Sequence, residues 1–312
     1  MSSGRIVVVG SSNIDLVIRL DRLPRPGETW RGRDLITAPG GKGANQAVGA
    51  ARAGGRVTFI ARVGRDAFGD QAIAGFERDG IDITRVMRDP SAPTGTALIL
   101  VDRNGRNMIA AASGANDRLT PADVNRARHA FAGAKIVLLQ LESPSPTVEA
   151  AAALAAQRGA RVILNPAPAR PVTDRLLATI SILTPNETEA ELLTGIKVDT
   201  DKGAERAADR LFARGVGTVI ITLGARGTFV AGDGVRMRVP GIRVRAVDTT
   251  AAGDIFNGAF AVGLAEGLPL IDAVHFANAA AAISVTRMGA QPSAPTRAEI
   301  RRMLGRKLGN RH

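Results

Sequence analysis

Hydrophobic positions along this chain fall into two alternating patterns. Short continuous apolar runs, typical of buried strands, alternate with stretches in which apolar and small residues recur every three to four positions, typical of helices that cover a sheet. Repeated strand–helix units predict an α/β fold with a mostly parallel central sheet and helices on both faces. Strands are predicted at 5–10, 58–64, 135–142, 161–168, the start of 180–195 and both ends of 218–230, and helices within 38–54, 66–80, 120–131, 146–158, the end of 180–195, 203–214, 252–266, 270–287 and 296–304.

Two segments depart from this alternation. Residues 16–36 combine extended patterns with a Pro/Gly loop, and 96–112 place alternating apolar runs around Asn104-Gly105, a strong hairpin turn signal. We expect the two segments to form a small β-sheet lid. A small sheet cannot bury its apolar face alone and leaves its edges open, so we expect two lids to pair in a homodimer. No internal repeat or linker divides the chain, and residues 1–312 are expected to form one domain.

Composition narrows the class of protein. Of the 312 residues, 45% are hydrophobic and 22% charged, which is typical of a globular protein with a sizeable core. The absence of cysteine excludes disulfides, thiolate metal sites and a cysteine nucleophile. The first strand follows MSSGR directly, and no apolar run is long enough to span a bilayer. We therefore expect a cytoplasmic protein without a membrane partner.

The formal net charge of +12 needs a separate explanation. Lysine and arginine total 41, of which five are lysines, so 41 − 5 leaves 36 arginines. They are scattered, apart from a cluster at 301–312, and aromatic residues are only 3% with no tyrosine. Nucleic-acid binders usually combine a basic patch with aromatic side chains or a recognition helix. We therefore expect no nucleic-acid partner, and a surface that favours anionic small substrates.

The stretch 247–260 carries the strongest chemical signal. An apolar run at 244–249 predicts a strand, which leads through three small residues, Ala251 to Gly253, into the helix that begins near Asp254. Bare N–H groups at a helix N-terminus, approached through small residues, are suited to bind a phosphate or oxyanion. A carboxylate beside such a site makes sense as a general base for an attacking hydroxyl. Alternatively, Asp254 is only a helix cap and Asp248 a turn residue.

A second glycine-rich helix start lies at 38–54. Gly40, Gly41 and Gly43 let backbone approach a ligand, while Lys42 and Asn45 supply polar contacts. The spacing differs from the phosphate-binding loop of nucleotide triphosphatases, and no Ser or Thr follows the lysine. A glycine-rich helix start without a ligand is the alternative.

Polar residues also recur where predicted strands end. The carboxyl ends of parallel strands meet at one edge of a sheet, where ligands bind. Asn186 and Glu189, one helical turn apart, are suited to hold a hydrated Mg²⁺, although the same pair fits a capping box. The residues at or just beyond strand ends are Asn13, Asp15, Glu142, Asn165, Asn186, Thr222 and Asp254.

Two motifs identify a family. The segment APGGKGANQAVGAARAG resembles the first signature of the ribokinase (phosphofructokinase-B type) family of sugar and nucleoside kinases, and DTTAAGDIFNGAF resembles its second. LLQLESP, LNPAPAR, LTPNETEAELLTG and ITLGARG are similar to the ribose-phosphorylating branch of that family. The resemblance covers nearly the whole chain, from VVVGSSNID to VTRMGAQPSAPT.

The resemblance implies a ribokinase-like fold and an ATP-dependent kinase acting on the 5-hydroxyl of D-ribose. It implies Asp254 as the catalytic base, with the backbone of Ala251, Ala252 and Gly253 as an anion hole for the transferring phosphoryl group. The ribose contacts that it implies are Asn13, Asp15, Gly41, Lys42, Asn45 and Glu142, together with Asp254.

The resemblance also implies a nucleotide side and two cations. Mg²⁺ is implied near Asn186 through a water-mediated contact from Glu189, and a monovalent cation, usually K⁺, is implied beside the anion hole. The implied ATP contacts are Asn186, Thr222, Gly224, Gly227, Gly253 and Asn278. The implied K⁺ positions, several of them through backbone carbonyls, are Asp248, Thr250, Ser284, Arg287, Gly289 and Ser293.

Two rival functions stay open at this point. A related kinase for another sugar or a nucleoside would share these motifs, although few aromatic residues exist to hold a base. A non-catalytic sugar-binding regulator on the same fold is the other rival, and an intact Asp254 with its anion hole argues against it.

Overall fold

The central sheet is the frame on which the rest of the chain is built. The computed structural model describes residues 4–309, and within this range nine strands form one sheet. Its strands are parallel from one edge through β11 and antiparallel beyond it, which confirms the mostly parallel prediction. The order is β13 (Val235–Val239), β12 (Thr228–Gly232), β11 (Thr218–Thr222), β10 (Ile182–Leu183), β9 (Arg161–Leu164), β8 (Ala134–Leu139), β1 (Arg5–Val9), β4 (Arg56–Gly64) and β5 (Asp82–Asp89).

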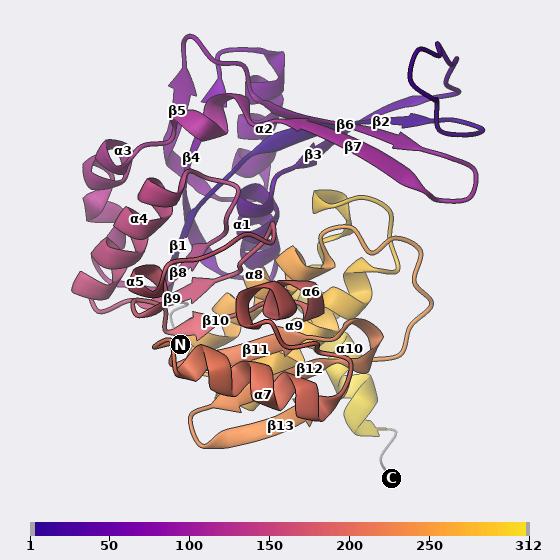
Figure 1. Ribbon diagram of the computed structural model, residues 1–312. Coiled ribbons are helices and arrows are strands. Elements are labelled where there is room, and N and C mark those ends of the chain that lie inside the picture. Colours follow the sequence, from indigo (N-terminus) through magenta and orange to yellow (C-terminus); the bar gives the residue numbers. More distant parts are fainter. Residues whose placement is uncertain (1–3, 310–312) are drawn as a thin grey trace.

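Helices cover both faces of this sheet (Figure 1). Alternation along β1 shows why: Ile6 and Val8 enter one buried cluster, whereas Val7 and Val9 enter the other. One face is covered by α1 (Lys42–Arg52), α2 (Ala67–Arg78), α8 (Ala252–Ala265), α9 (Leu270–Ser284) and α10 (Arg297–Gly309). The other is covered by α3 (Pro121–Arg126), α4 (Ser145–Gln157), α5 (Asp174–Leu177), α6 (Glu187–Thr194) and α7 (Asp201–Phe212). Short 3₁₀ turns are η1 (Gly114–Arg118), η2 (Arg128–Phe131), η3 (Gly224–Arg226) and η4 (Gln291–Ser293).

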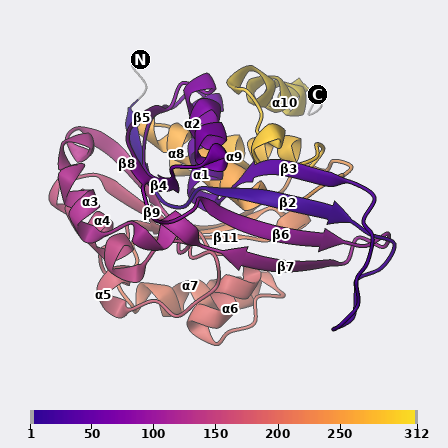
Figure 2. The same ribbon diagram turned by 90° about the horizontal axis from the view of Figure 1, so that it is seen from above.

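A second sheet projects from the α/β body (Figures 1 and 2). Its order is β3 (Leu35–Gly40), β2 (Asn13–Arg19), β6 (Gly95–Val101) and β7 (Asn107–Ala112). The hairpin predicted at 96–112 is confirmed, but the other lid segment extends beyond 16–36. Its ladder begins at the body, because Asn13 pairs with both Gly40 and Gly95. Residues 20–34 between β2 and β3 form no strand.

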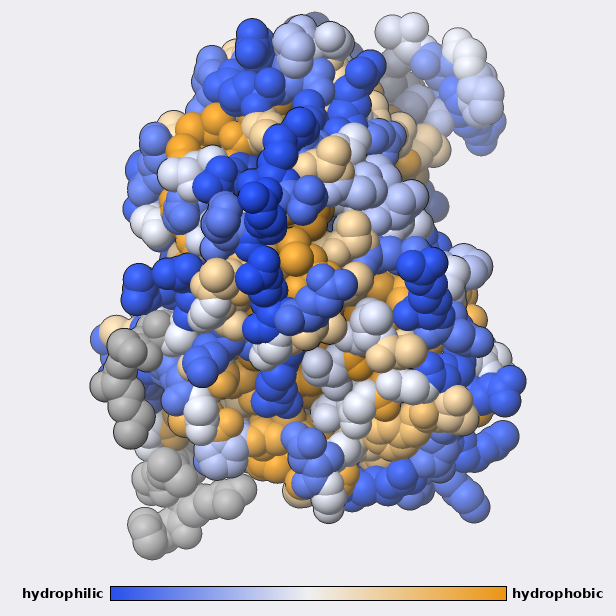
Figure 3. Space-filling model, turned by 90° about the vertical axis from the view of Figure 1, so that its left-hand side faces the viewer, coloured by the Kyte–Doolittle hydropathy of each residue, from blue (hydrophilic) through white to orange (hydrophobic). Residues whose placement is uncertain are grey.

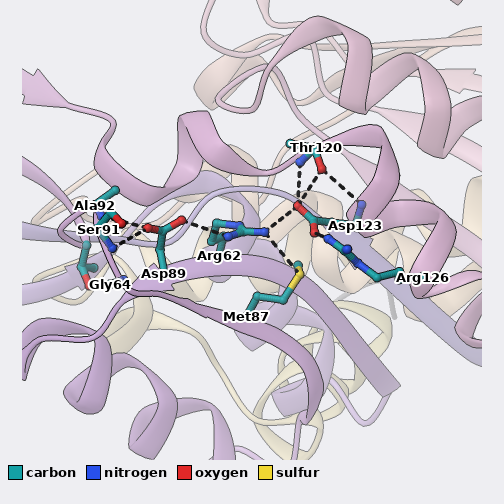
Figure 4. Close-up of polar contacts among 10 residues, drawn as sticks. Arg62, Gly64, Met87, Asp89, Ser91, Ala92, Thr120, Asp123 and Arg126 are labelled. Atoms are coloured by element: carbon teal, nitrogen blue, oxygen red, sulfur yellow. Dashed lines mark hydrogen bonds and ion pairs between the residues drawn. The ribbon is translucent and has the colours of Figure 1, made fainter.

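Ion pairs between Arg62 and two buried carboxylates lie at the base of this second sheet (Figure 4). Arg62 on β4 donates to Asp89 at the end of β5, at 2.9 Å, and to Asp123 of α3, at 2.8 Å. Asp89 in turn accepts the backbone N–H groups of Ser91 and Ala92, at 2.9 and 2.8 Å. The loop that leads into β6 is therefore tied to the central sheet by charge-assisted bonds, which are stronger than neutral ones.

Two predictions about local structure were wrong. The apolar run at 244–249 is not a strand, because the N–H groups of Val247 and Asp248 donate to the carbonyl of Val285, just past α9, at 2.7 and 3.2 Å. The strands β5 and β13 were not predicted. Both are at the sheet's edges, and their many charged residues mask the apolar pattern expected of a buried strand.

Helices α1 and α8 lie on the same face of the central sheet and approach each other closely. A Cβ added at Gly258 of α8 would lie 2.6 Å from both the amide nitrogen of Ala50 and the carbonyl oxygen of Gln46. A Cβ at Gly49 of α1 would lie 3.3 Å from the Cα of Ile255. Glycine is therefore required where the two backbones meet, and this contact fixes the start of α8 against α1.

The outer surface is mixed in character. Figure 3 shows hydrophilic side chains spread over one side of the body, with apolar areas between them. Within residues 4–309, none of the helices combines the length and the apolar character needed to cross a bilayer.

Candidate active site

The N-terminus of α8 forms the centre of the candidate site. Ala251 precedes the helix in a left-handed conformation, with φ 58° and ψ 12°, which is uncommon for a residue other than glycine. Such strain is characteristic of functional turns, where the surroundings hold it in place. The N–H of Ala252 donates to the carbonyl of Thr249 at 3.2 Å, whereas the N–H of Gly253 donates to no backbone carbonyl within residues 4–309. The N-terminus of α8 therefore offers backbone N–H donors to an anion, and the N–H of Gly253 is one of them.

Asp254 is the buried carboxylate of this helix end. Only 5% of its surface is exposed, and it accepts bonds from the side-chain amides of Asn45, at 3.0 Å, and Gln46, at 3.1 Å. Burial raises its pKa, while Lys42 and the two amides oppose that rise. A carboxylate with a raised pKa and a nearby cation is suited to accept a proton.

Lys42 lies among four carboxylates. Burial alone would lower its pKa, but Asp254, Glu142, Glu189 and Asp15 together hold that pKa above its ordinary value. The lysine therefore stays charged at the point where the carboxylates of both halves of the site converge. Such a cation is suited to offset the negative charge that a phosphoryl group brings into a buried site.

The predicted sugar-binding residues surround this lysine on one side. Glu142 accepts the backbone N–H of Lys42 at 2.9 Å and the hydroxyl of Ser11 at 2.6 Å. Burial and Glu142 raise the pKa of Asp15 to about 6, against the effect of Lys42. Gly41 makes the approach possible, since its φ is 87° and a Cβ there would lie 2.7 Å from the N of Asn13.

Two of these residues lie in the second sheet. Asn13 and Asp15, expected just beyond the end of the first strand, follow β1 and lie within the next strand, β2. The amide of Asn116 donates to the side-chain oxygen of Asn13 at 2.7 Å and fixes its orientation. The second sheet therefore supplies side chains to the site directly.

The predicted nucleotide side lies at the ends of β10 and β11. Asn186 caps α6 in a full capping box with Glu189, and it also forms an isolated bridge with Thr222. Both carboxylate oxygens of Glu189 bind Asn186, at 2.8 and 2.9 Å, and burial raises the pKa of this glutamate. The predicted capping box is present, and each carboxylate oxygen keeps a further lone pair for a water.

The glycines of the β11–β12 turn have different surroundings. A Cβ at Gly224 would meet nothing within 4 Å, whereas one at Gly227 would lie 2.2 Å from the carbonyl oxygen of Val239. Gly224 therefore leaves open space above the turn, and Gly227 is required for packing. Asn278 of α9 accepts the hydroxyl of Thr228 at 2.8 Å.

Several buried polar atoms in this region lack a partner. Buried polar groups are normally satisfied, so such atoms indicate where a ligand or water binds. Those in or beside the predicted site are Asn45 Oδ1, Asn278 Nδ2, Ser12 Oγ and Gln140 Oε1.

Three of the predicted K⁺ positions, Asp248, Thr250 and Gly289, meet at the Asp248 carboxylate. This carboxylate accepts the N–H of Thr250, at 2.9 Å, and of Gly289, at 2.8 Å, and so joins two segments distant in sequence. Burial opposes its ionisation, but these donors hold its pKa below the usual value. Ser284 and Ser293 donate their hydroxyls to local carbonyls, at 2.9 and 2.7 Å, so their oxygens remain acceptors. The Arg287 guanidinium pairs with Glu299 and offers no oxygen.

Sequence reasoning missed several residues that build the site. Gln46 and Ser11 contact Asp254 and Glu142 directly, while Asn116 and Gln140 support Asn13 and Gln46. The sequence did contain one indication of a buried polar site here, because Gln46 is a polar residue among the alanines of α1. A cavity of about 470 Å³ at the amino ends of β1, β4 and β5 is lined by none of the predicted site residues.

Comparison with known proteins agrees with this geometry. The family described as pfkB family carbohydrate kinase matches residues 3–297, and the chain belongs to that family. It is similar to a ribokinase of Haemophilus influenzae, with 46% identity over 299 residues, which cover 96% of this chain and 98% of that protein.

Two further proteins bear on the fold and the substrate. The solved structure of Arabidopsis thaliana ribokinase complexed with ribose and ATP has a TM-score of 0.90 and 35% identity, covering 97% of this chain and 99% of that one. A deoxyribokinase of Salmonella typhi is 38% identical over 292 residues, which cover 93% of this chain and 95% of that protein. The predicted family and the ribokinase-like fold are thereby confirmed.

Proposed function

We propose that this chain is an ATP-dependent kinase that phosphorylates the 5-hydroxyl of D-ribose, giving ribose 5-phosphate and ADP. The observation that carries the proposal is the buried Asp254 at the open N-terminus of α8, with Lys42 beside it. The similarity to ribokinases, over nearly the full length of both chains, supports ribose as the substrate.

In the proposed reaction, Asp254 accepts the proton of the sugar hydroxyl, while Lys42 and the N-terminus of α8 stabilise the transferring phosphoryl group. As the 5-hydroxyl oxygen attacks the γ-phosphorus of ATP, its proton passes to a carboxylate oxygen of Asp254, and the bond between that phosphorus and the oxygen bridging to ADP breaks. The N–H groups at Ala251 to Gly253 stabilise the negative charge on the transferring phosphoryl group. Lys42 supplies a positive charge on the same side. The Ala252 N–H already bonds Thr249 at 3.2 Å, so the N–H groups of Ala251 and Gly253 carry most of this stabilisation.

Sugar binding falls to the residues of β2 and the start of α1. Asp15 and Glu142 accept hydrogen bonds from sugar hydroxyls, and Asn13 and Lys42 donate to them. The unpaired Oδ1 of Asn45 accepts a further one. Pairing hydroxyls with buried polar groups gives strong discrimination, because an analogue that lacks one leaves its partner unpaired.

The nucleotide and Mg²⁺ are assigned to the α6 side. Asn186, Thr222, Gly224, Gly227 and Asn278 contact ATP, and the open space at Gly224 fits a bound nucleotide. When bound, Mg²⁺ would offset the negative charge of the phosphates, and this ion usually keeps most of its waters. No cluster of three or more acidic or histidine side chains suited to a metal occurs within residues 4–309. Glu189 and Asn186 would hold the ion, with Glu189 acting through a water, because Asn186 already binds both of its oxygens.

The test of the proposed function is a turnover assay with ATP and a panel of pentoses, hexoses and nucleosides that includes 2-deoxyribose. The deoxyribokinase relative makes 2-deoxyribose the sharpest competitor, and few aromatic residues are present to hold a nucleoside base. Ribose should have the highest kcat/KM. A higher value for any other acceptor would overturn the assignment.

Replacing the base should separate binding from chemistry. Asp254→Ala or Asn should lower kcat by roughly 10²–10⁴-fold, the usual contribution of a general base, while ribose binding measured by calorimetry stays close to wild type. Asp272→Asn is the matched control, because Asp272 is an exposed acid in the first turn of the neighbouring helix α9. Near wild-type turnover of the Asp254 variants at saturating substrate would exclude the base assignment.

The second sheet should form a homodimer interface. Its strand register places Ile18, Leu35, Leu100 and Met108 in one row, and Leu98 lies on the same face in the adjacent row. Leu98 and Met108 are each 50% exposed. Apolar side chains also occur on the other face, in the row Ile36, Val17, Ile99 and Ile109, which corrects the expectation of one apolar face.

Light scattering at micromolar concentration should therefore give a dimer. Leu98→Ser combined with Met108→Ser should give a monomer, because the variant removes apolar area from the proposed interface. Leu192→Ser with Met237→Ser is the control, since both residues are similarly exposed but lie on the α/β body. A fully active wild-type monomer would refute the dimer.

Activity should also depend on a monovalent cation the size of K⁺. The two segments that Asp248 joins would supply carbonyl oxygens, and a cation there would offset the carboxylate and hold the turn that presents Gly253. Adding K⁺ at constant ionic strength to Na⁺- and K⁺-free buffer should raise kcat roughly tenfold or more, given what single oxyanion donors contribute. Cs⁺ and Na⁺ are tested in parallel.

Asp248→Asn should abolish the stimulation. Asp233→Asn, at an exposed turn acid elsewhere in the chain, should retain it. Full wild-type activity in the cation-free buffer would refute the K⁺ site.

A further inference from the structure

Gln46 is a polar residue in the tightly packed interior of the molecule. Its side chain is fully buried on α1, next to Asn45. Its Nε2 donates to a carboxylate oxygen of Asp254 and to Oδ1 of Asn165, both at 3.1 Å, and its Oε1 accepts from Nε2 of Gln140 at 2.6 Å. Because an ionised carboxylate only accepts hydrogen bonds, the amide has one possible orientation, and all of its hydrogen-bonding groups are used.

The hydrogen bonds continue from Asn165 back to the start of α8. Asn165 Nδ2 donates to the carbonyl of Thr184 at 3.0 Å, and the Thr184 hydroxyl donates to Oδ1 of Asn257 at 2.7 Å. Asn257 Nδ2 donates to the carbonyl of Gly253 at 2.8 Å. This network, Gln140–Gln46–Asn165–Thr184–Asn257, therefore reaches α8 twice, at Asp254 and at Gly253. Its side chains are almost fully buried, and apart from Gln140 Oε1 their polar atoms are hydrogen-bonded, which rigidifies the structure around them.

We propose that Gln46 is a positioning residue for phosphoryl transfer: it sets the orientation and ionisation of Asp254 and ties that carboxylate to the turn that presents Gly253. The inference rests on the proposed function, in which Asp254 is the base. Gln46 has no direct role toward sugar or nucleotide, because all of its hydrogen-bonding groups are engaged inside the protein.

A purely structural role would give a different experimental pattern. A buried amide that only stabilises the fold would lower the melting temperature without changing the titration of the base. The Gln46 bond favours the ionised form of Asp254, so its loss should raise the pKa of this carboxyl. Since the base acts only when ionised, a higher pKa shifts the acid limb of the kcat profile to higher pH.

The first variant is Gln46→Met, which keeps the volume and removes the amide. The expected result is a fall in kcat of roughly 10–100-fold, in the range for a misplaced catalytic group, with KM for ribose within about threefold. The acid limb should move up by about one pH unit, as expected for the loss of one hydrogen bond to a charged group. Gln46→Glu is the second variant if Gln46→Met does not fold. Its carboxyl must share a proton with Asp254, which moves the limb in the same direction.

The matched control is Thr147→Val. Thr147 is fully buried, and its hydroxyl makes one hydrogen bond, 2.6 Å to the carbonyl of Leu119 on the opposite face of the sheet. This variant loses a buried hydrogen bond, and its melting temperature should fall as in the Gln46 variants. Its pH profile should match that of the wild type.

A double-mutant cycle tests whether Gln46 acts through Asp254. In an Asp254→Ala background, Gln46→Met should change the residual kcat by less than about threefold, because its partner is already absent. A ¹³C NMR titration of the Asp254 carboxyl, assigned by its loss in Asp254→Ala, should show the pKa rise without any turnover.

The outcomes separate the two proposals. If ribose is not phosphorylated but the NMR pKa still rises in Gln46→Met, the proposed function fails and the link from Gln46 to Asp254 stands. An unchanged carboxyl pKa and acid limb in Gln46→Met, or equal losses of kcat in both backgrounds, would overturn the inference.

Discussion

The close approach of α1 and α8 is the constraint on which the candidate site depends. Gly258 faces the backbone at Gln46 and Ala50, and there is no room for a Cβ between the two helices. At this separation two consecutive amides of α1, Asn45 and Gln46, both reach the carboxylate of Asp254. The helix contact brings together the starts of α1 and α8, which are more than two hundred residues apart in sequence. Their charged and polar side chains form one site.

This packing also determines the ionisation of Asp254 and the charges around it. Burying Asp254 without compensation would neutralise it, and the amides of α1 together with Lys42 limit that effect. The same lysine is surrounded by Asp15 and Glu142 on the sugar side and by Glu189 on the nucleotide side. One cation therefore serves both halves of a site that must bring an anionic nucleotide to a neutral sugar.

The features that the sequence predicted well are those with a local cause. Apolar runs predicted the parallel strands except β5, Thr120 and Asn186 cap the expected helices, and Asn104-Gly105 lies in the expected hairpin loop. The 244–249 segment was mispredicted because a helix end, not a neighbouring strand, accepts its N–H groups.

The site could be predicted only in part, for a related reason. The strand-end rule and the family motifs led to residues that the structure does bring together around Lys42. The role of Gln46 was missed, because Asn165 and Asp254, two of its hydrogen-bond partners, lie 119 and 208 residues further along the chain. No local pattern reports a partner at that distance.

The most direct test of this account is kcat at saturating ribose and ATP in Gly258→Ala. The added Cβ must push α1 and α8 apart, so the account predicts a fall in kcat of about 10-fold or more in protein that circular dichroism shows to be folded at the assay temperature. Gly305→Ala, where a Cβ on α10 meets nothing within 4 Å, should keep wild-type kcat. Folded Gly258→Ala with undiminished kcat would contradict the claim that this helix contact sets the site.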